Sequence, residues 1–128
     1  MGSTAATVAA AAVQLDAERL DVYVVAREFD ALAARLVPRR GQAALRDQLE
    51  RASSSILLNI AEGAGRYARA DKAQFYLIAR GSAMECAAAL DVLLGRGLIS
   101  AASHRHARGL LVRIVQMLTR LTQRMQSR

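Results

Sequence analysis

The sequence predicts an all-α protein, an antiparallel up-down-up-down bundle of four helices, and three observations support this. Alanine, the best helix former, is abundant, whereas the 128 residues include one proline and eight glycines. Apolar residues recur at spacings of three and four along four long stretches. Short segments that contain Gly, Pro or Ser separate these stretches, so that successive helices are expected to turn back on one another.

The first helix is expected over residues 16–36, where an apolar stripe begins at Val22 and continues through Phe29. Pro38 ends it, because proline cannot continue a helix. The second helix is expected over residues 43–64, with an apolar stripe of its own.

The third helix, expected over residues 71–94, differs from the others. Between residues 73 and 94 its charged residues are Arg80, Glu85 and Asp91, so it is apolar nearly all round. One four-helix bundle buries only the inward stripe of each helix, and the remaining apolar surface indicates self-association. The alternative is an alanine-rich surface that tolerates water.

The fourth helix is expected over residues 100–125, with Ser100 as its N-cap. The net charge of the chain is +7, and residues 92–128 contain seven arginines and no acidic residue. Most of these cations share one face of the fourth helix. The candidate nucleic-acid-binding residues are Arg105, His106, Arg113, Arg120, Arg124 and Arg128.

A row of arginines suits the phosphates of a polyanion, because each guanidinium is a planar fork of donors. We therefore expect binding to RNA or DNA that depends strongly on salt and tolerates any sequence. No aromatic residue lies among these arginines in the sequence, so base-specific recognition is not expected. The alternative is a solvated face, with Arg used in place of Lys because the genome is GC-rich.

Catalytic and metal-binding patterns are missing from the sequence. There is no Glu-x-x-His pair, no haem-attachment motif, no phosphate-binding Gly-rich loop and no nucleophile elbow. His104 and His106 point apart on a helix, and Cys86 lies on an apolar stripe. We expect no enzyme, no cofactor and no metal, unless an oligomer interface brings Glu62, Arg66 and histidines together from different subunits.

Residues 1–14 are expected to form a flexible tail before a single domain, residues 15–128. The tail lacks the basic and strongly apolar regions of a secretory signal, and no stretch is long and apolar enough to span a membrane. A cytoplasmic protein without membrane contact is expected.

Two segments carry a specific motif. Residues 59–66 read Asn-Ile-Ala-Glu-Gly-Ala-Gly-Arg, and residues 75–85 read Phe-Tyr-Leu-Ile-Ala-Arg-Gly-Ser-Ala-Met-Glu. Their order and spacing resemble the four-helix-bundle family of 23S ribosomal RNA intervening-sequence proteins, from about residue 20 to the C-terminus. Tyr76 replaces the usual Leu, and Ala68 replaces the usual Ser, so the third helix is expected to lack its capping box.

The resemblance implies a homo-oligomer, a ring of five bundles in known members. A related branch is the accessory protein of diversity-generating retroelements, a basic pentamer that binds nucleic acid and the reverse transcriptase. The implied partners are thus further copies of the chain, RNA or DNA, and a reverse transcriptase. The alternative function is a protein-interaction scaffold, or a reverse-transcriptase accessory with no nucleic-acid function of its own.

The motif residues expected to act together in a polar network are Asn59, Glu62, Gly63, Arg66, Gly81, Ser82 and Glu85. The first four share one face of the second helix by their spacing. Buried polar groups need hydrogen-bond partners, and Ser82 and Glu85 are the expected ones, with Gly81 letting two backbones approach. Such a network would fix helix register and subunit geometry; the alternative is a pocket for a ligand or RNA.

Overall fold

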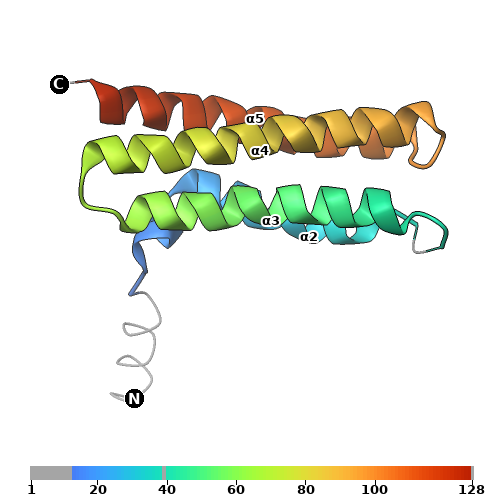
Figure 1. Cartoon of the computed structure of the whole chain (residues 1–128), viewed down its shortest axis with the longest axis horizontal. Helices are drawn as coiled ribbons and strands as arrows, with labels where there is room; N and C mark the ends of the chain where they lie inside the picture. Colours follow the sequence, from blue (N-terminus) through green and yellow to red (C-terminus); the bar gives the residue numbers. More distant parts are fainter. Residues whose placement is uncertain (1–12, 39, 128) are drawn as a thin grey trace, which may run out of the picture.

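The computed structural model describes residues 13–38 and 40–127, and within them the protein is all-α, with no strand. The elements are a short 3-10 helix η1 (Asp16–Arg19) and the helices α2 (Asp21–Leu36), α3 (Ala43–Gly65), α4 (Arg69–Gly95) and α5 (Ala101–Gln126). The α2–α3 and α4–α5 turns lie at one end of the bundle, and the α3–α4 loop lies at the other (Figure 1). The predicted all-α class with four long helices is confirmed.

The start of the first helix differs from the prediction. Residues 16–19 form the separate helix η1, and Leu20 has an extended backbone, with φ −92° and ψ 128°, before α2 begins at Asp21. The Glu18 carboxylate accepts a hydrogen bond from the Leu15 backbone N–H at 2.8 Å, which holds η1 as a local turn. Residues 1–12 of the expected tail lie outside the described residues.

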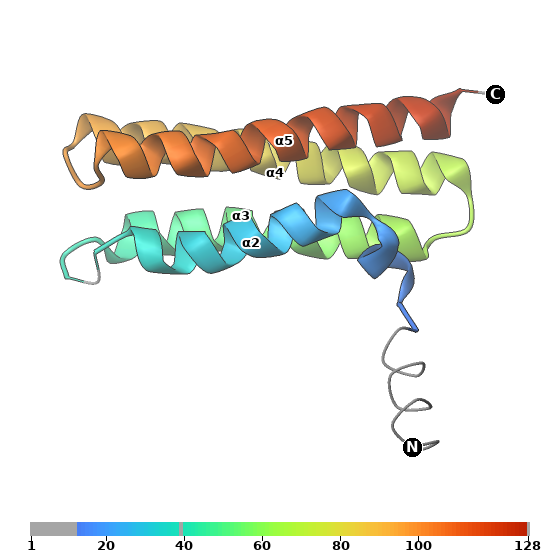
Figure 2. The same cartoon turned by 180° about the vertical axis from the view of Figure 1, so that it is seen from behind.

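The four helices form a square around one core. α3 packs on α4, α4 on α5, and α2 on both α3 and α5, so that α2 and α4 are diagonal (Figures 1 and 2). The largest fully buried side chains include Phe29, Leu49, Ile56, Leu90 and Ile114. Cys86 is also buried, as its place on an apolar stripe predicts, and burial raises the pKa of its thiol to about 12.

The two predictions about helix capping are confirmed. α4 follows Ala68, which makes no side-chain cap bond, and it begins at Arg69, two residues before the expected start. At α5 the Ser100 hydroxyl accepts a hydrogen bond from the Ser103 N–H at 3.0 Å and satisfies a donor that the helix leaves open.

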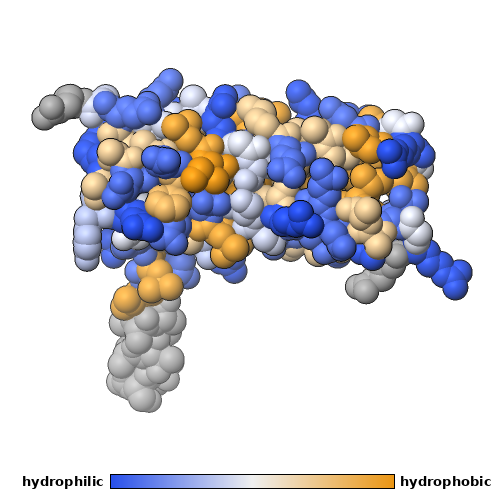
Figure 3. All heavy atoms as spheres, in the orientation of Figure 1, coloured by the Kyte–Doolittle hydropathy of each residue, from blue (hydrophilic) through white to orange (hydrophobic). Residues whose placement is uncertain are grey.

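The outward face of α4 remains apolar in the single chain. Its exposed apolar side chains include Leu77, Ile78, Met84 and Val92, with exposed fractions between 39% and 47%. On the side shown in Figure 3, apolar residues over α4 and α3 are interspersed with hydrophilic residues. In the described part of the chain, no helix has the length and apolar character needed to cross a membrane.

Candidate nucleic-acid interface

The predicted basic face of α5 is open to solvent. Arg105, His106, Arg113, Arg120 and Arg124 are all exposed, and Arg128 lies outside the described residues. The opposite side of α5 supplies buried core residues such as Leu111, Ile114 and Leu118. The amphipathic pattern therefore directs the cations outward, because the apolar stripe must face the core.

In the described part of the chain, no carboxylate forms an ion pair with a cation of this row. In residues 13–38 and 40–127 the ion pairs are Arg66 with Glu62 and His104 with Asp91, and neither involves a residue of the basic face. The positive potential of α5 is therefore available to an external anion.

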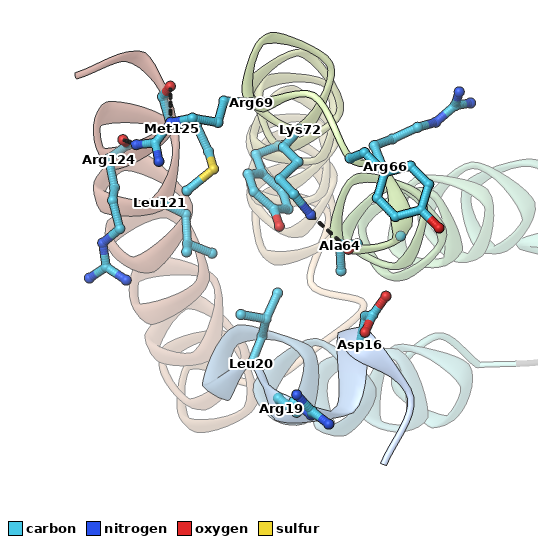
Figure 4. A pocket seen from close by; sticks show the side chains of 13 residues that line it. Asp16, Arg19, Leu20, Ala64, Arg66, Arg69, Lys72, Leu121, Arg124 and Met125 are labelled. Carbon is cyan, nitrogen blue, oxygen red and sulfur yellow. Dashed lines mark hydrogen bonds between the residues drawn. The ribbon is translucent and has the colours of Figure 1, made fainter. Parts of the chain in front are cut away.

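The structure adds further cations to one end of this row. A cavity of about 490 Å³ at the end of the bundle is lined by five basic side chains, those of Arg19, Arg66, Arg69, Lys72 and Arg124, and by one acid, Asp16 (Figure 4). η1, the α3–α4 junction and the C-terminal turn of α5 meet there. A second hollow is lined by Arg19, Arg120 and Arg124 together with the acid Asp21.

Two of these cations also cap the C-terminal ends of helices. The Lys72 ammonium donates to the carbonyls of Ala64 at 2.8 Å and Gly63 at 3.3 Å, at the end of α3. Arg69 donates to the carbonyls of Arg124 and Met125 at the end of α5. A cation at a helix C-terminus satisfies open carbonyls and opposes the negative end of the helix dipole, so both contacts stabilise the fold.

Three residues of the basic surface were not predicted from the sequence: Arg19, Arg69 and Lys72. They belong to other helices, and only the arrangement of the bundle brings them to the end of α5. A signal was available, because in an up-down bundle the starts of the first and third helices lie beside the ends of the second and fourth.

The motif network is smaller than expected and passes through a residue that sequence analysis did not single out. The half-buried Asn59 donates to the Ser55 carbonyl at 2.8 Å and to the Ser55 hydroxyl at 3.1 Å. The Ser55 and Ser82 hydroxyls are 2.8 Å apart, which joins α3 to α4. Ser82 is thus part of the network, but through Ser55 rather than by a direct bond to Asn59.

The charged motif residues lie outside this network. Glu62 and Arg66 form an exposed ion pair at 2.8 Å within α3 and its C-cap, and the Arg66 guanidinium lies 4.8 Å from the Phe75 ring centroid. Glu85 is exposed. The expectation that Glu85 serves as a hydrogen-bond partner for Asn59 or Glu62 is wrong, because its position on α4 directs it to solvent.

The close approach of two helices occurs at Gly63, not at Gly81. A methyl group on Gly63 would lie 2.8 Å from Cε1 of Tyr76 and 3.1 Å from Cβ of Phe75. Gly81 is exposed, with no atom within 4 Å of an added Cβ, so the close-packing role expected for it inside the chain is wrong. The added methyl group would meet α4 at Tyr76, which is buried, and burial raises the pKa of the Tyr76 hydroxyl above its ordinary value of 10.0.

The two histidines are in different surroundings, as their spacing predicts. His104 Nε2 lies 2.9 Å from the Asp91 carboxylate and links α5 to α4, whereas His106 is exposed on the basic face. In the described part of the chain, no three His, Cys, Asp or Glu side chains are grouped closely enough to hold a metal ion.

Comparison with known proteins places the chain in a family. No curated protein matches the chain. The family model for the 23S rRNA-intervening sequence protein matches residues 18–120, which include all of α2, α3 and α4 and most of α5. The chain therefore belongs to the 23S rRNA-intervening sequence protein family.

Proposed function

We propose that this protein is a non-enzymatic homo-oligomer, built from antiparallel four-helix bundles, that binds the backbone of RNA or DNA through α5. The observation that carries the proposal is the row of exposed cations on α5 without an ion-pair partner in the described part of the chain.

The chemistry of the row favours a polyanion over a small anion. Arg113, Arg120 and Arg124 recur at intervals of seven and four residues along one helix, so their guanidinium groups follow a line rather than converge on a point. Each can pair with a phosphate, and none is positioned by a built pocket that would read a base. Binding is therefore expected to tolerate any sequence and to weaken steeply with salt.

The proposed oligomer forms through the outward face of α4. Leu77, Ile78 and Met84 are each about half exposed on that face, and Leu58 of α3 is 67% exposed. A contiguous exposed apolar patch marks an interaction surface, and burying it against another copy removes it from water. A ring of five would repeat the +7 charge of each subunit and strengthen the field at the basic faces.

The oligomer is tested by light scattering on Leu77→Glu, with Val24→Glu as the matched control. Val24 is an exposed apolar residue of α2, with 56% of its surface open to water. We expect wild type and Val24→Glu to have five times the 13.8 kDa subunit mass and Leu77→Glu to be smaller. A wild-type monomer, or an unchanged mass for Leu77→Glu, would contradict the proposed interface.

Nucleic-acid binding is tested with the triple variant Arg113→Gln, Arg120→Gln and Arg124→Gln. Its control removes the same charge elsewhere, from the exposed Arg27, Arg35 and Arg51 of α2 and α3.

Filter binding to duplex DNA and to RNA at low salt is expected to fall at least tenfold for the α5 variant and much less for the control. An equal loss in both variants would show that net charge, not the α5 face, is responsible. No binding by wild type would favour a scaffold, or a reverse-transcriptase accessory without its own nucleic-acid function, whose apolar α4 face binds protein.

A further inference from the structure

Tyr67 is the most exposed aromatic residue of the described chain. It lies in the α3–α4 loop, and its exposed fraction is 100%. The loop is anchored on both sides, by the Arg66 N–H to the Gly63 carbonyl at 3.2 Å and by the Lys72 N–H to the Ala68 carbonyl at 3.0 Å. A short, anchored loop therefore holds an aromatic ring entirely in solvent.

Tyr67 stands between two hollows. The end cavity of about 490 Å³ has a neighbour, a further hollow of about 1000 Å³. Both are lined by Gly65, Arg66 and Tyr67. Both are open hollows in the surface rather than enclosed cavities. Arg66 flanks the ring on a side chain that Glu62 and the Phe75 ring already hold in place.

The two hollows differ in charge. The smaller is lined by five basic residues and one acid, Asp16, whereas the larger has Arg66 with the acids Glu62 and Asp71. In Figure 4 the Arg19 and Arg124 side chains lie at the rim of the smaller one, on η1 and α5, with their guanidinium groups turned away from its centre. Phosphates would be favoured in the basic hollow, beside an aromatic ring that is free to stack.

We propose that this end of the bundle binds single-stranded nucleic acid, with an unpaired base stacked on Tyr67 and the adjoining phosphates in the basic hollow. The proposal rests on the proposed function and deepens it by naming the class of strand. A base paired inside a duplex cannot leave its stack without cost, whereas an unpaired base is free to stack on an aromatic side chain. Stacking does not depend on base identity, which agrees with sequence-tolerant binding by the α5 row.

The test uses full-length protein and four labelled 20-nucleotide probes: single-stranded RNA, single-stranded DNA of the same sequence, and the duplex of each. Tyr67→Ala removes the ring, and Tyr67→Phe is the matched control, because it keeps the stacking surface. Since Tyr67 contributes nothing to the core, circular dichroism is expected to be the same for all three proteins.

Anisotropy titrations are expected to show a loss of about 5- to 150-fold in single-strand affinity for Tyr67→Ala and none for Tyr67→Phe. Duplex affinity is expected to stay within twofold for both variants. A loss of affinity in Tyr67→Ala for single-stranded RNA, single-stranded DNA or both supports the proposal and identifies which polymer stacks on Tyr67. Unchanged single-strand affinity in Tyr67→Ala, or an equal loss on duplex, overturns it while the α5 proposal stands; absence of any wild-type binding overturns both.

A second readout uses the absence of tryptophan from the chain. In Tyr67→Trp the new indole is the only one, and we expect a single-stranded probe to quench its fluorescence and a duplex not to. Quenching that is equal with both probes, or absent with both, contradicts stacking at this position.

Discussion

Replacing Gly63 by alanine tests whether α3 and α4 meet rigidly at the family motif. An alanine in place of an unhindered helical glycine gains up to about 1 kcal/mol of stability. At Gly63 the added methyl group would lie 2.8 Å from Cε1 of Tyr76, a ring with only 3% of its surface exposed. Overpacking of this kind costs about 1–3 kcal/mol, so Gly63→Ala is expected to lower the free energy of unfolding by up to about 2 kcal/mol.

Gly109 provides the matched control. It lies inside α5, is exposed, and has no atom within 4 Å of an added Cβ, so Gly109→Ala is expected to stabilise the fold by about 0.5–1 kcal/mol. The two substitutions should therefore shift the urea midpoint, followed by helical circular dichroism, in opposite directions. With a denaturant slope of about 1–3 kcal/mol per molar, each kcal/mol moves the midpoint by about 0.3–1 M.

A double-mutant cycle identifies the contact responsible. In a Tyr76→Leu background the ring edge is missing, and the cost of Gly63→Ala is expected to shrink, since the two residues are direct neighbours. A midpoint that rises equally for Gly63→Ala and Gly109→Ala would refute the inference of a rigid close approach. If Gly63→Ala lowers the free energy of unfolding equally with and without the Tyr76 ring, the strain does not come from the contact with that ring.

Three further outcomes are expected from urea unfolding. Lys72→Met removes the donor to the last carbonyls of α3 and should lower the free energy of unfolding by about 1–3 kcal/mol. An unchanged midpoint would show that water replaces the ammonium group. Asp30→Ala leaves the hydroxyl of Ser53, which is 1% exposed, without its 2.8 Å acceptor and should cost about 1–3 kcal/mol; no loss would contradict the importance of this bond. Burial raises the pKa of Cys86 from about 9 to about 12, so its contribution to stability is complete below pH 9 and is lost as the pH rises towards 12. Cys86→Ala should therefore lose less stability than wild type over that range, and parallel pH profiles would contradict this.

Periodicity was enough to predict the helices, because each long stretch has its own apolar stripe and its own stop signal. It failed at residues 16–20, which precede the apolar stripe, because the Glu18 side chain bonds to the Leu15 backbone and Leu20 is extended. Local side-chain bonds of this kind compete with the helix and leave no mark on the spacing of apolar residues.

The α5 residues of the candidate site were predictable from the spacing within one helix, whereas the rest of the surface required the arrangement of the whole bundle. A single helix sorts Arg113 and Arg120 onto one face by its own geometry, so sequence spacing is sufficient. Arg19, Arg69 and Tyr67 reach the same end of the molecule only through the packing of four helices, which sequence spacing does not report.

The polar motif shows a related difference. Its pattern correctly indicates contact between α3 and α4, yet the bridging Ser55 is outside the motif, and Gly63 rather than Gly81 is the point of closest approach. Helical spacing places each glycine on a face of its helix, but it does not report that the ring of Tyr76 lies against Gly63 and that no side chain lies as close to Gly81.

The proposed function depends most on α5 as the surface that contacts phosphates, and the salt dependence of binding tests this directly. The slope of log K against log salt concentration for duplex DNA falls by about 0.9 for each phosphate neutralised. The variant without Arg113, Arg120 and Arg124 is therefore expected to have a slope about 2.7 units shallower than wild type. A wild-type slope near zero, or the same slope in both proteins, would contradict the assignment of nucleic-acid binding to α5.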